Sequence, residues 1–141
     1  MTEDVRVPPI ELHVETRADP DTAWRTLTEP ARVVLWLTAA STPRRVGEAY
    51  RLDFGDGSVV RGEILRLEPG RAFAHRWAWE DAPAGEATTV TWTVERLEGG
   101  TVIRLRHDGW DEAGLDAGAR DDHEGYWTGY LDDLRDVLED G

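Results

Sequence analysis

The clearest hydrophobic pattern of this sequence lies near its C-terminal end. Apolar and aromatic residues recur there at steps of three and four, and acidic residues fill most of the positions between them. This period is that of an amphipathic helix, whose apolar stripe needs a partner surface. The sequence therefore predicts a long helix over residues 119–139, with an inner face made by His123, Trp127, Tyr130, Leu131, Leu134 and Leu138.

Most of the preceding chain alternates between apolar and polar residues, which is typical of half-buried strands. The first such run covers residues 10–15, and five more follow at residues 50–54, 59–67, 71–80, 88–97 and 101–107. Short turn sequences such as Gly55-Asp56-Gly57 and Gly99-Gly100 separate several of these runs. Strands joined by such short turns must be antiparallel neighbours.

Two short helices are predicted between the first strand and the others. Asp19-Pro20 and Glu29-Pro30 each place Pro at a favourable first helical position, and Asp19 can cap the first helix. Residues 38–46 are predicted to be a linker. The order of strand, two helices, five strands and long helix indicates an α+β fold in a single domain, residues 1–141, with a curved six-stranded antiparallel sheet wrapped around the last helix.

Composition narrows the possible functions. The 141 residues carry a net charge of −13, which disfavours binding to nucleic acids and to anionic membranes. The absence of Cys and Lys from the sequence excludes disulfides, thiol nucleophiles and Schiff-base chemistry. No signal peptide and no run of membrane-spanning length is visible, so we expect a cytoplasmic protein.

Metal-binding and catalytic motifs are not evident. Asp121-Asp122-His123-Glu124 is rich in possible ligands, but acidic residues are favoured at a helix N-terminus by the helix dipole alone. Neither of the two Ser residues, Ser41 and Ser58, lies in a nucleophile-elbow motif. We therefore predict no metal, no cofactor and no catalytic residue.

The aromatic residues carry the strongest functional signal. In the run over residues 71–80, Phe73, His75, Trp77 and Trp79 share one face. Large inward rings either fill the space between sheet and helix or line an apolar cavity of roughly 300–1,000 Å³. An inward His can be structural, can anchor a ligand, or can act as a general acid or base. The candidate ligand-binding residues are Trp36, Phe73, His75, Trp77, Trp92, His107, His123, Trp127 and Tyr130.

Four motifs, in order along the chain, resemble those of a known family. They are Ala23-Trp24 to Thr28-Glu29-Pro30 with Leu35-Trp36; Gly62-Glu63-Ile64 through Glu68-Pro69 to His75-Arg76-Trp77; Gly100-Thr101, Leu105, His107 and Gly109-Trp110; and His123, Gly125, Trp127, Leu131 and Leu134. The order of elements resembles the helix-grip fold of the START-related (SRPBCC) superfamily. The motifs resemble its AHSA-like branch, which is similar to the C-terminal domain of the activator of Hsp-90 ATPase.

The aromatic face and the resemblance together imply three functions. The preferred one is a binding protein, monomeric or homodimeric, for a small apolar or aromatic molecule. The second is an enzyme similar to the polyketide cyclases and aromatases of the same superfamily, in which a His such as His107 or an Arg moves protons. The third is an interaction protein that acts on a chaperone.

Overall fold

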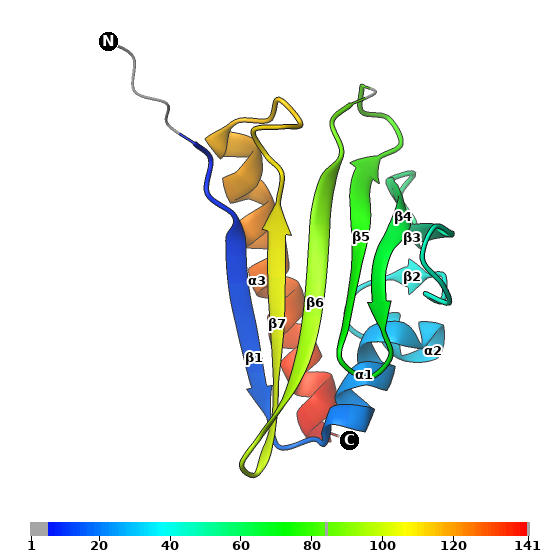
Figure 1. Ribbon diagram of the computed structural model, residues 1–141, viewed down its shortest axis with the longest axis vertical. Helices are drawn as coiled ribbons and strands as arrows, with labels where there is room; N and C mark the ends of the chain where they lie inside the picture. The colour runs from blue at the N-terminus through cyan, green and yellow to red at the C-terminus, as the bar shows by residue number, and fades with distance from the viewer. Residues whose placement is uncertain (1–5, 84, 141) are drawn as a thin grey trace.

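The computed structural model describes residues 6–83 and 85–140 (Figure 1). In chain order the elements are β1 (Ile10–Thr16), α1 (Pro20–Thr28), α2 (Pro30–Val33), β2 (Ala39–Ala40), β3 (Ala49–Asp53), β4 (Val59–Glu68), β5 (Ala72–Trp79), β6 (Thr88–Leu97), β7 (Gly100–Asp108) and α3 (Ala117–Asp140). The predicted α+β class and the order of elements are confirmed.

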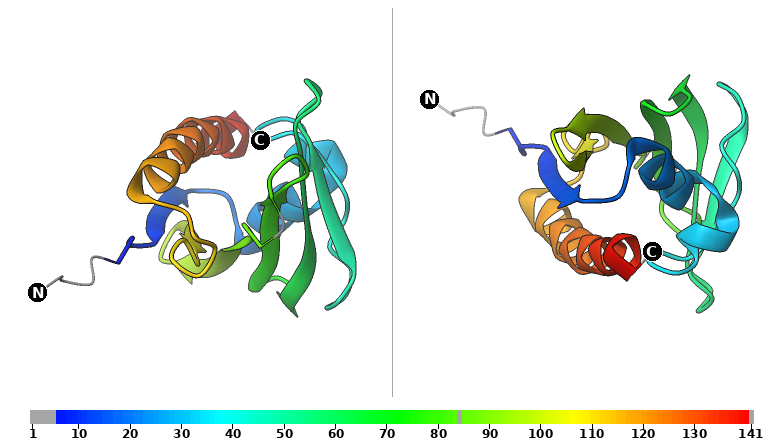
Figure 2. Two further views of the ribbon diagram at one scale, coloured as in Figure 1. Left: turned by 90° about the horizontal axis from the view of Figure 1, so that it is seen from above. Right: turned by 90° about the horizontal axis from the view of Figure 1, so that it is seen from below.

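The strands form one antiparallel sheet in the order β1-β7-β6-β5-β4-β3-β2. Seen along the strands, the sheet curls, and α3 lies on its inner side next to β1 (Figure 2). The two short helices α1 and α2 cover the other end of the inner face (Figure 1). This is the helix-grip arrangement.

The predicted number of strands was wrong by one. The sheet has seven strands, because Ala39 and Ala40, in the predicted linker, pair with Asp53 and Leu52 of β3. Two small residues carry no alternation of apolar and polar side chains, so the sequence holds no sign of this strand. Its pairing follows from the position of β3, which leaves an open edge beside it.

The long helix α3 begins two residues earlier and ends one residue later than predicted. The side chain of Asp116 accepts a hydrogen bond from the backbone N–H of Ala119 at 2.9 Å, which caps the first turn. The predicted inner face is confirmed: four of its residues are buried, and His123 and Tyr130 are half-buried. Gly125 and Gly129 of α3 do not mediate a close approach, since a Cβ added to either would meet no atom within 4 Å.

Aromatic side chains fill the core near α1 and α2. Trp36 donates its indole N–H to the carbonyl of Thr26 at 2.8 Å and packs edge-on against Trp92, with ring centroids 5.6 Å apart. On the neighbouring strand, Phe73 packs edge-on against Trp24 at 5.7 Å. Towards the opposite end of the sheet the inner space is only partly filled, and a cavity remains there.

Candidate functional site

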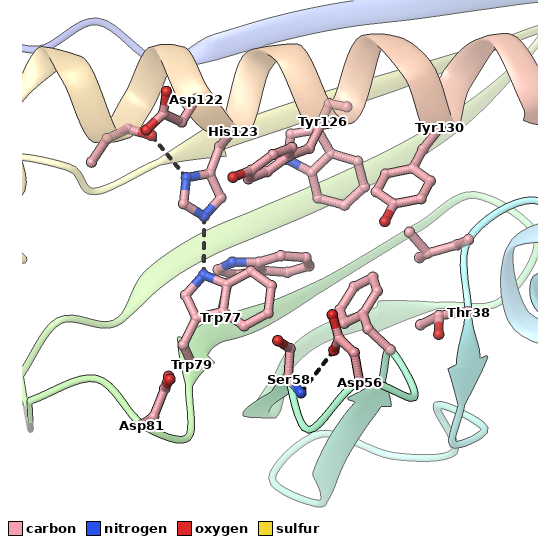
Figure 3. A pocket seen from close by; sticks show the side chains of 14 residues that line it. Thr38, Asp56, Ser58, Trp77, Trp79, Asp81, Asp122, His123, Tyr126 and Tyr130 are labelled. Atoms are coloured by element: carbon pink, nitrogen blue, oxygen red, sulfur yellow. Dashed lines mark hydrogen bonds between the residues drawn. The ribbon is translucent and has the colours of Figure 1, made fainter.

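A cavity of about 670 Å³ opens between the first half of α3 and the strands β3 to β5 (Figure 3). Its lining comes from segments that are far apart in the sequence. The helix contributes one wall, the β3–β4 hairpin and the end of β5 contribute the facing wall, and the segment before β2 closes one side. The lining residues are Leu37, Thr38, Phe54, Asp56, Ser58, Trp77, Trp79, Asp81, Ala119, Asp122, His123, Tyr126, Trp127 and Tyr130.

Six of the lining residues are aromatic, excluding His123. Trp77 forms the floor with Trp127, their ring centroids 5.1 Å apart. Phe54, in the β3–β4 hairpin, has its ring centroid 5.6 Å from that of Trp79 and 6.2 Å from that of Tyr130. The aromatic rings offer flat apolar surfaces to a bound molecule.

Three acidic residues are among the lining residues. Asp56 and Asp81 come from the strand side and Asp122 from the helix side (Figure 3). The carboxylate of Asp56 accepts a hydrogen bond from the backbone N–H of Ser58 at 2.9 Å. This bond, followed by one from the Ser58 hydroxyl, lowers the pKa of Asp56, so its side chain is negatively charged at neutral pH.

His123 joins the two walls. The indole N–H of Trp79 donates to Nε2 of His123 at 3.1 Å, so Nε2 carries no proton. Nδ1 lies 2.8 Å from the carbonyl oxygen of Ala119, which can only accept, so Nδ1 carries the proton. The imidazole is thus neutral, and burial lowers its pKa. The hydrogen bond between Trp79 and His123 ties β5 to α3 along one side of the cavity.

His107 lies behind the floor and is fully buried. Trp127 donates its indole N–H to Nδ1 of His107 at 3.0 Å, so the proton of the neutral ring is on Nε2. Nε2–H faces the hydroxyl of Thr88 at 2.6 Å, and this hydroxyl donates in turn to the carbonyl of Trp77 at 3.3 Å. Burial, and then the proximity of His123 and His75, lowers the pKa of His107 to about 2. Both ring nitrogens are engaged in holding α3, β7, β6 and β5 together.

His75 is also part of the core. Only 1% of its surface is exposed, and Nδ1–H donates to the carbonyl of Arg76 at 3.0 Å. Burial lowers its pKa to about 4, although the hydrogen bond to the carbonyl acts in the opposite direction. The ring packs against Tyr50, with centroids 4.5 Å apart, and it does not border the cavity.

Residues 17–139 match the family model described as Activator of Hsp90 ATPase homolog 1-like protein. The chain belongs to this family. The match confirms the resemblance that the sequence motifs indicate, and it places this AHSA1-like protein in the START-related superfamily.

Three solved structures are similar to this AHSA1-like protein. A protein from Mesorhizobium loti is 21% identical, with 93% of this chain and 96% of that chain covered and a TM-score of 0.82. The Aha1 dimer from Colwellia psychrerythraea is 24% identical, with coverages of 94% and 96% and a TM-score of 0.77. DynU16, from the dynemicin biosynthetic locus, is 24% identical at a TM-score of 0.82, but the 92% of this chain that matches spans only 46% of DynU16. Identities this low show the fold alone. The comparison with curated proteins gives no match.

Four of the nine candidate residues of the AHSA1-like protein border the cavity: Trp77, His123, Trp127 and Tyr130. The other five are packed in the core beneath and beside it, and they are Trp36, Phe73, His75, Trp92 and His107. Sequence reasoning did not select ten lining residues, among them Phe54 and Trp79. Alternation along the strands predicts that both rings lie on the inner face of the sheet. Alternation does not tell which inner positions lie at the open end of the cavity.

One polar atom of the floor has no partner. Among the buried side-chain nitrogen and oxygen atoms of residues 6–83 and 85–140, only the indole nitrogen of Trp77 makes no hydrogen bond. A buried N–H without an acceptor costs about 1–3 kcal/mol. The indole N–H of Trp77 is therefore a buried hydrogen-bond donor without an acceptor.

Two further observations concern the described part of the chain. It contains no group of three or more His, Asp or Glu side chains arranged to hold a metal ion. None of its helices is both long enough and apolar enough to cross a membrane.

Proposed function

We propose that this AHSA1-like protein binds a small apolar or aromatic molecule in the cavity between α3 and strands β3 to β5. The observation that carries the proposal is the cavity itself, about 670 Å³ and lined by six aromatic side chains. Small-molecule sites are typically clefts of about 300–1,000 Å³, lined mainly by apolar and aromatic groups with a few polar ones. The volume of this cavity fits that description, and its lining combines six aromatic side chains with six polar ones.

The surroundings of the cavity favour a preformed site. Trp127 is fixed by its hydrogen bond to His107, and Trp79 by its bond to His123. Rings held in this way lose little conformational freedom when a molecule binds, so less of the interaction energy is spent on ordering the site.

The positions of the histidines favour binding over catalysis. His107, the residue that the enzymatic alternative would use, is fully buried and has both nitrogens engaged. Of the histidines in the described chain, only His123 borders the cavity. A cyclase-like activity would therefore have to use His123, and its Nε2 would first have to release the indole of Trp79.

The binding proposal is tested with N-phenyl-1-naphthylamine, a neutral dye that fluoresces in apolar sites. We expect saturable fluorescence at one site per chain. Tyr130→Ala removes one wall of the cavity and should weaken dye binding about tenfold or more, with little loss of thermal stability because Tyr130 is only half-buried. Tyr130 is the better choice than Trp77, whose ring is 4% exposed and packs in the core.

The matched control for this test is Leu105→Ala, which changes a core residue that does not border the cavity. Removing a buried Leu side chain costs about 2–5 kcal/mol of stability, so this variant should melt earlier but bind the dye with unchanged affinity while folded. Parallel loss of binding and stability in both variants would mean that the dye reports on partial unfolding, and the proposal would fail.

A second candidate function is binding to an Hsp90-type chaperone, which the family match over residues 17–139 favours. It predicts a complex with the purified chaperone and a faster chaperone ATPase. If the purified chaperone gives neither a complex by sedimentation nor a change in ATP turnover, this candidate is ruled out. The dye experiment is independent of it.

A further inference from the structure

The charged groups around the cavity all have the same sign. Asp56 lies in the β3–β4 turn, Asp81 follows β5, and Asp122 lies in the first turns of α3, so three separate segments each bring a carboxylate to the lining. Although the chain has sixteen basic residues, no Arg is among the lining residues of the described chain. The cavity thus has a locally negative mouth.

These three carboxylates are also not neutralised by partners. Across residues 6–83 and 85–140, no ion pair involves Asp56, Asp81 or Asp122. Their neighbours in the chain behave differently, since Glu80 pairs with Arg61 and Asp121 pairs with Arg120. Unlike these two neighbours, the three acidic residues that line the cavity are not paired with Arg.

The negative charge of Asp56 acts on a residue of the opposite cavity wall. After burial, the negative charge of Asp56 is the largest influence that raises the pKa of Tyr130, a residue of the opposite wall. A charge that disfavours a second negative charge at this position favours a positive one.

The walls add an attraction of the same sign. Aromatic rings carry a negative potential over their faces, and a cation within about 6 Å of a ring centroid is attracted to it. In the cavity lining, the ring centroid of Phe54 lies 5.6 Å from that of Trp79 and 6.2 Å from that of Tyr130. Boxes of aromatic rings recognise quaternary ammonium groups in this way.

We propose that the molecule bound in this cavity is a cation, an apolar or aromatic body that bears a quaternary or protonated amine. The apolar body lies on the floor formed by Trp77 and Trp127, and the cationic group lies at the mouth between the aromatic rings and the carboxylates of Asp56 and Asp81. This inference rests on the proposed function, because it names the class of ligand for the same cavity.

The test compares three molecules of nearly the same shape and different charge. They are (2-naphthylmethyl)trimethylammonium, its neutral carbon analogue 2-neopentylnaphthalene, and the anion 2-naphthylmethanesulfonate. Each is titrated against the protein loaded with N-phenyl-1-naphthylamine, and displacement of the dye gives the affinity. We expect the ammonium compound to bind about tenfold or more tightly than the neutral analogue, and the sulfonate to bind most weakly.

Variants separate the local charges from the net charge of −13. Asp56→Asn and Asp81→Asn each remove one charge from the mouth and keep the size of the side chain. The control is Asp136→Asn, which removes one charge from an exposed position of α3 outside the cavity. We expect the first two variants to lower the preference for the ammonium compound several-fold and the control to leave it unchanged.

The outcomes distinguish this inference from the proposed function. If the neutral analogue displaces the dye as well as the ammonium compound does, the cationic ligand class is wrong and the binding cavity stands. If Asp136→Asn lowers the preference as much as Asp56→Asn, the preference reflects net charge and the inference again fails. If neither compound displaces the dye and Tyr130→Ala leaves dye binding unchanged, the cavity is not a binding site and both proposals fail.

Discussion

The buried histidines should make folding stability depend steeply on pH between 7 and 5. His107 and His75 have pKa values of about 2 and about 4 in the folded protein, against about 6.5 in an unfolded chain. Below pH 6.5 these two histidines therefore bind protons in the unfolded state but stay neutral in the folded state. Protonation then favours unfolding, so the stability that these residues contribute is fully present above pH 6.5 and is lost as the pH falls.

The magnitude follows from the linkage relation. One pKa unit corresponds to about 1.4 kcal/mol, and between pH 7 and pH 5 each of the two histidines accounts for about 2 kcal/mol. Together they should lower the free energy of unfolding by about 4 kcal/mol, a large share of the 5–15 kcal/mol that is typical of a domain. His123 acts in the same direction, because burial lowers its pKa as well.

The assay is urea denaturation at pH 7, 6 and 5 and constant ionic strength. His75→Phe keeps an aromatic ring in place but removes one titrating group, so the loss of stability between pH 7 and pH 5 should fall to about half. His13→Gln is the matched control, since the side chain of His13 is 57% exposed, and it should leave the loss unchanged. A free energy of unfolding that is flat over this range, or a His75→Phe profile parallel to that of the parent protein, would refute the reasoning.

Three further predictions concern the sheet, the helix and the hydrogen bond between them. Gly62→Ala should destabilise the protein by about 1–3 kcal/mol in urea titrations, because a Cβ there would lie 2.0 Å from the carbonyl oxygen of Arg76. Gly129→Ala should instead stabilise it by about 0.5–1 kcal/mol, since a Cβ there meets no atom within 4 Å; a loss of stability would show that α3 needs this glycine. Trp79→Phe removes the hydrogen bond that favours the neutral ring of His123, so the pKa of His123, followed by NMR, should rise; an unchanged pKa would contradict the role given to Trp79.

The fold could be predicted because its signals are local. The helical stripe from His123 to Leu138 and the alternation of the six longer strands each follow from periodicity within one segment. The strand formed by Ala39 and Ala40 was missed because its cause is not local: the backbone of these residues pairs with an edge that β3 provides. The side chains of these two alanines carry no pattern from which the strand could be predicted.

The candidate site was only partly predictable for a related reason. Alternation tells that Phe73 and Trp77 point to the same side of β5, but only Trp77 reaches the cavity. The local sequence explains why an acidic residue occurs in a turn at Asp56, in a loop at Asp81 and near a helix start at Asp122. Nothing in the sequence places the three around one opening, because their meeting depends on the curl of the sheet.

The position of the cavity follows from the widths of the packed elements. A single helix, α3, packs against β1 at one side of a curled sheet of seven strands, and β3 to β5 stand opposite it (Figure 2). Near α1 and α2 the remaining space is filled by Trp36 and Trp92. At the other end only the first half of α3 faces the strands, Trp77 and Trp127 meet between sheet and helix, and the space that the side chains leave unfilled is the cavity. The hydrogen bond of His107 to Trp127 holds one ring of the floor, and that of His123 to Trp79 holds one wall. The same neutral histidines that stabilise the fold above pH 6.5 therefore also determine the surface that a ligand meets.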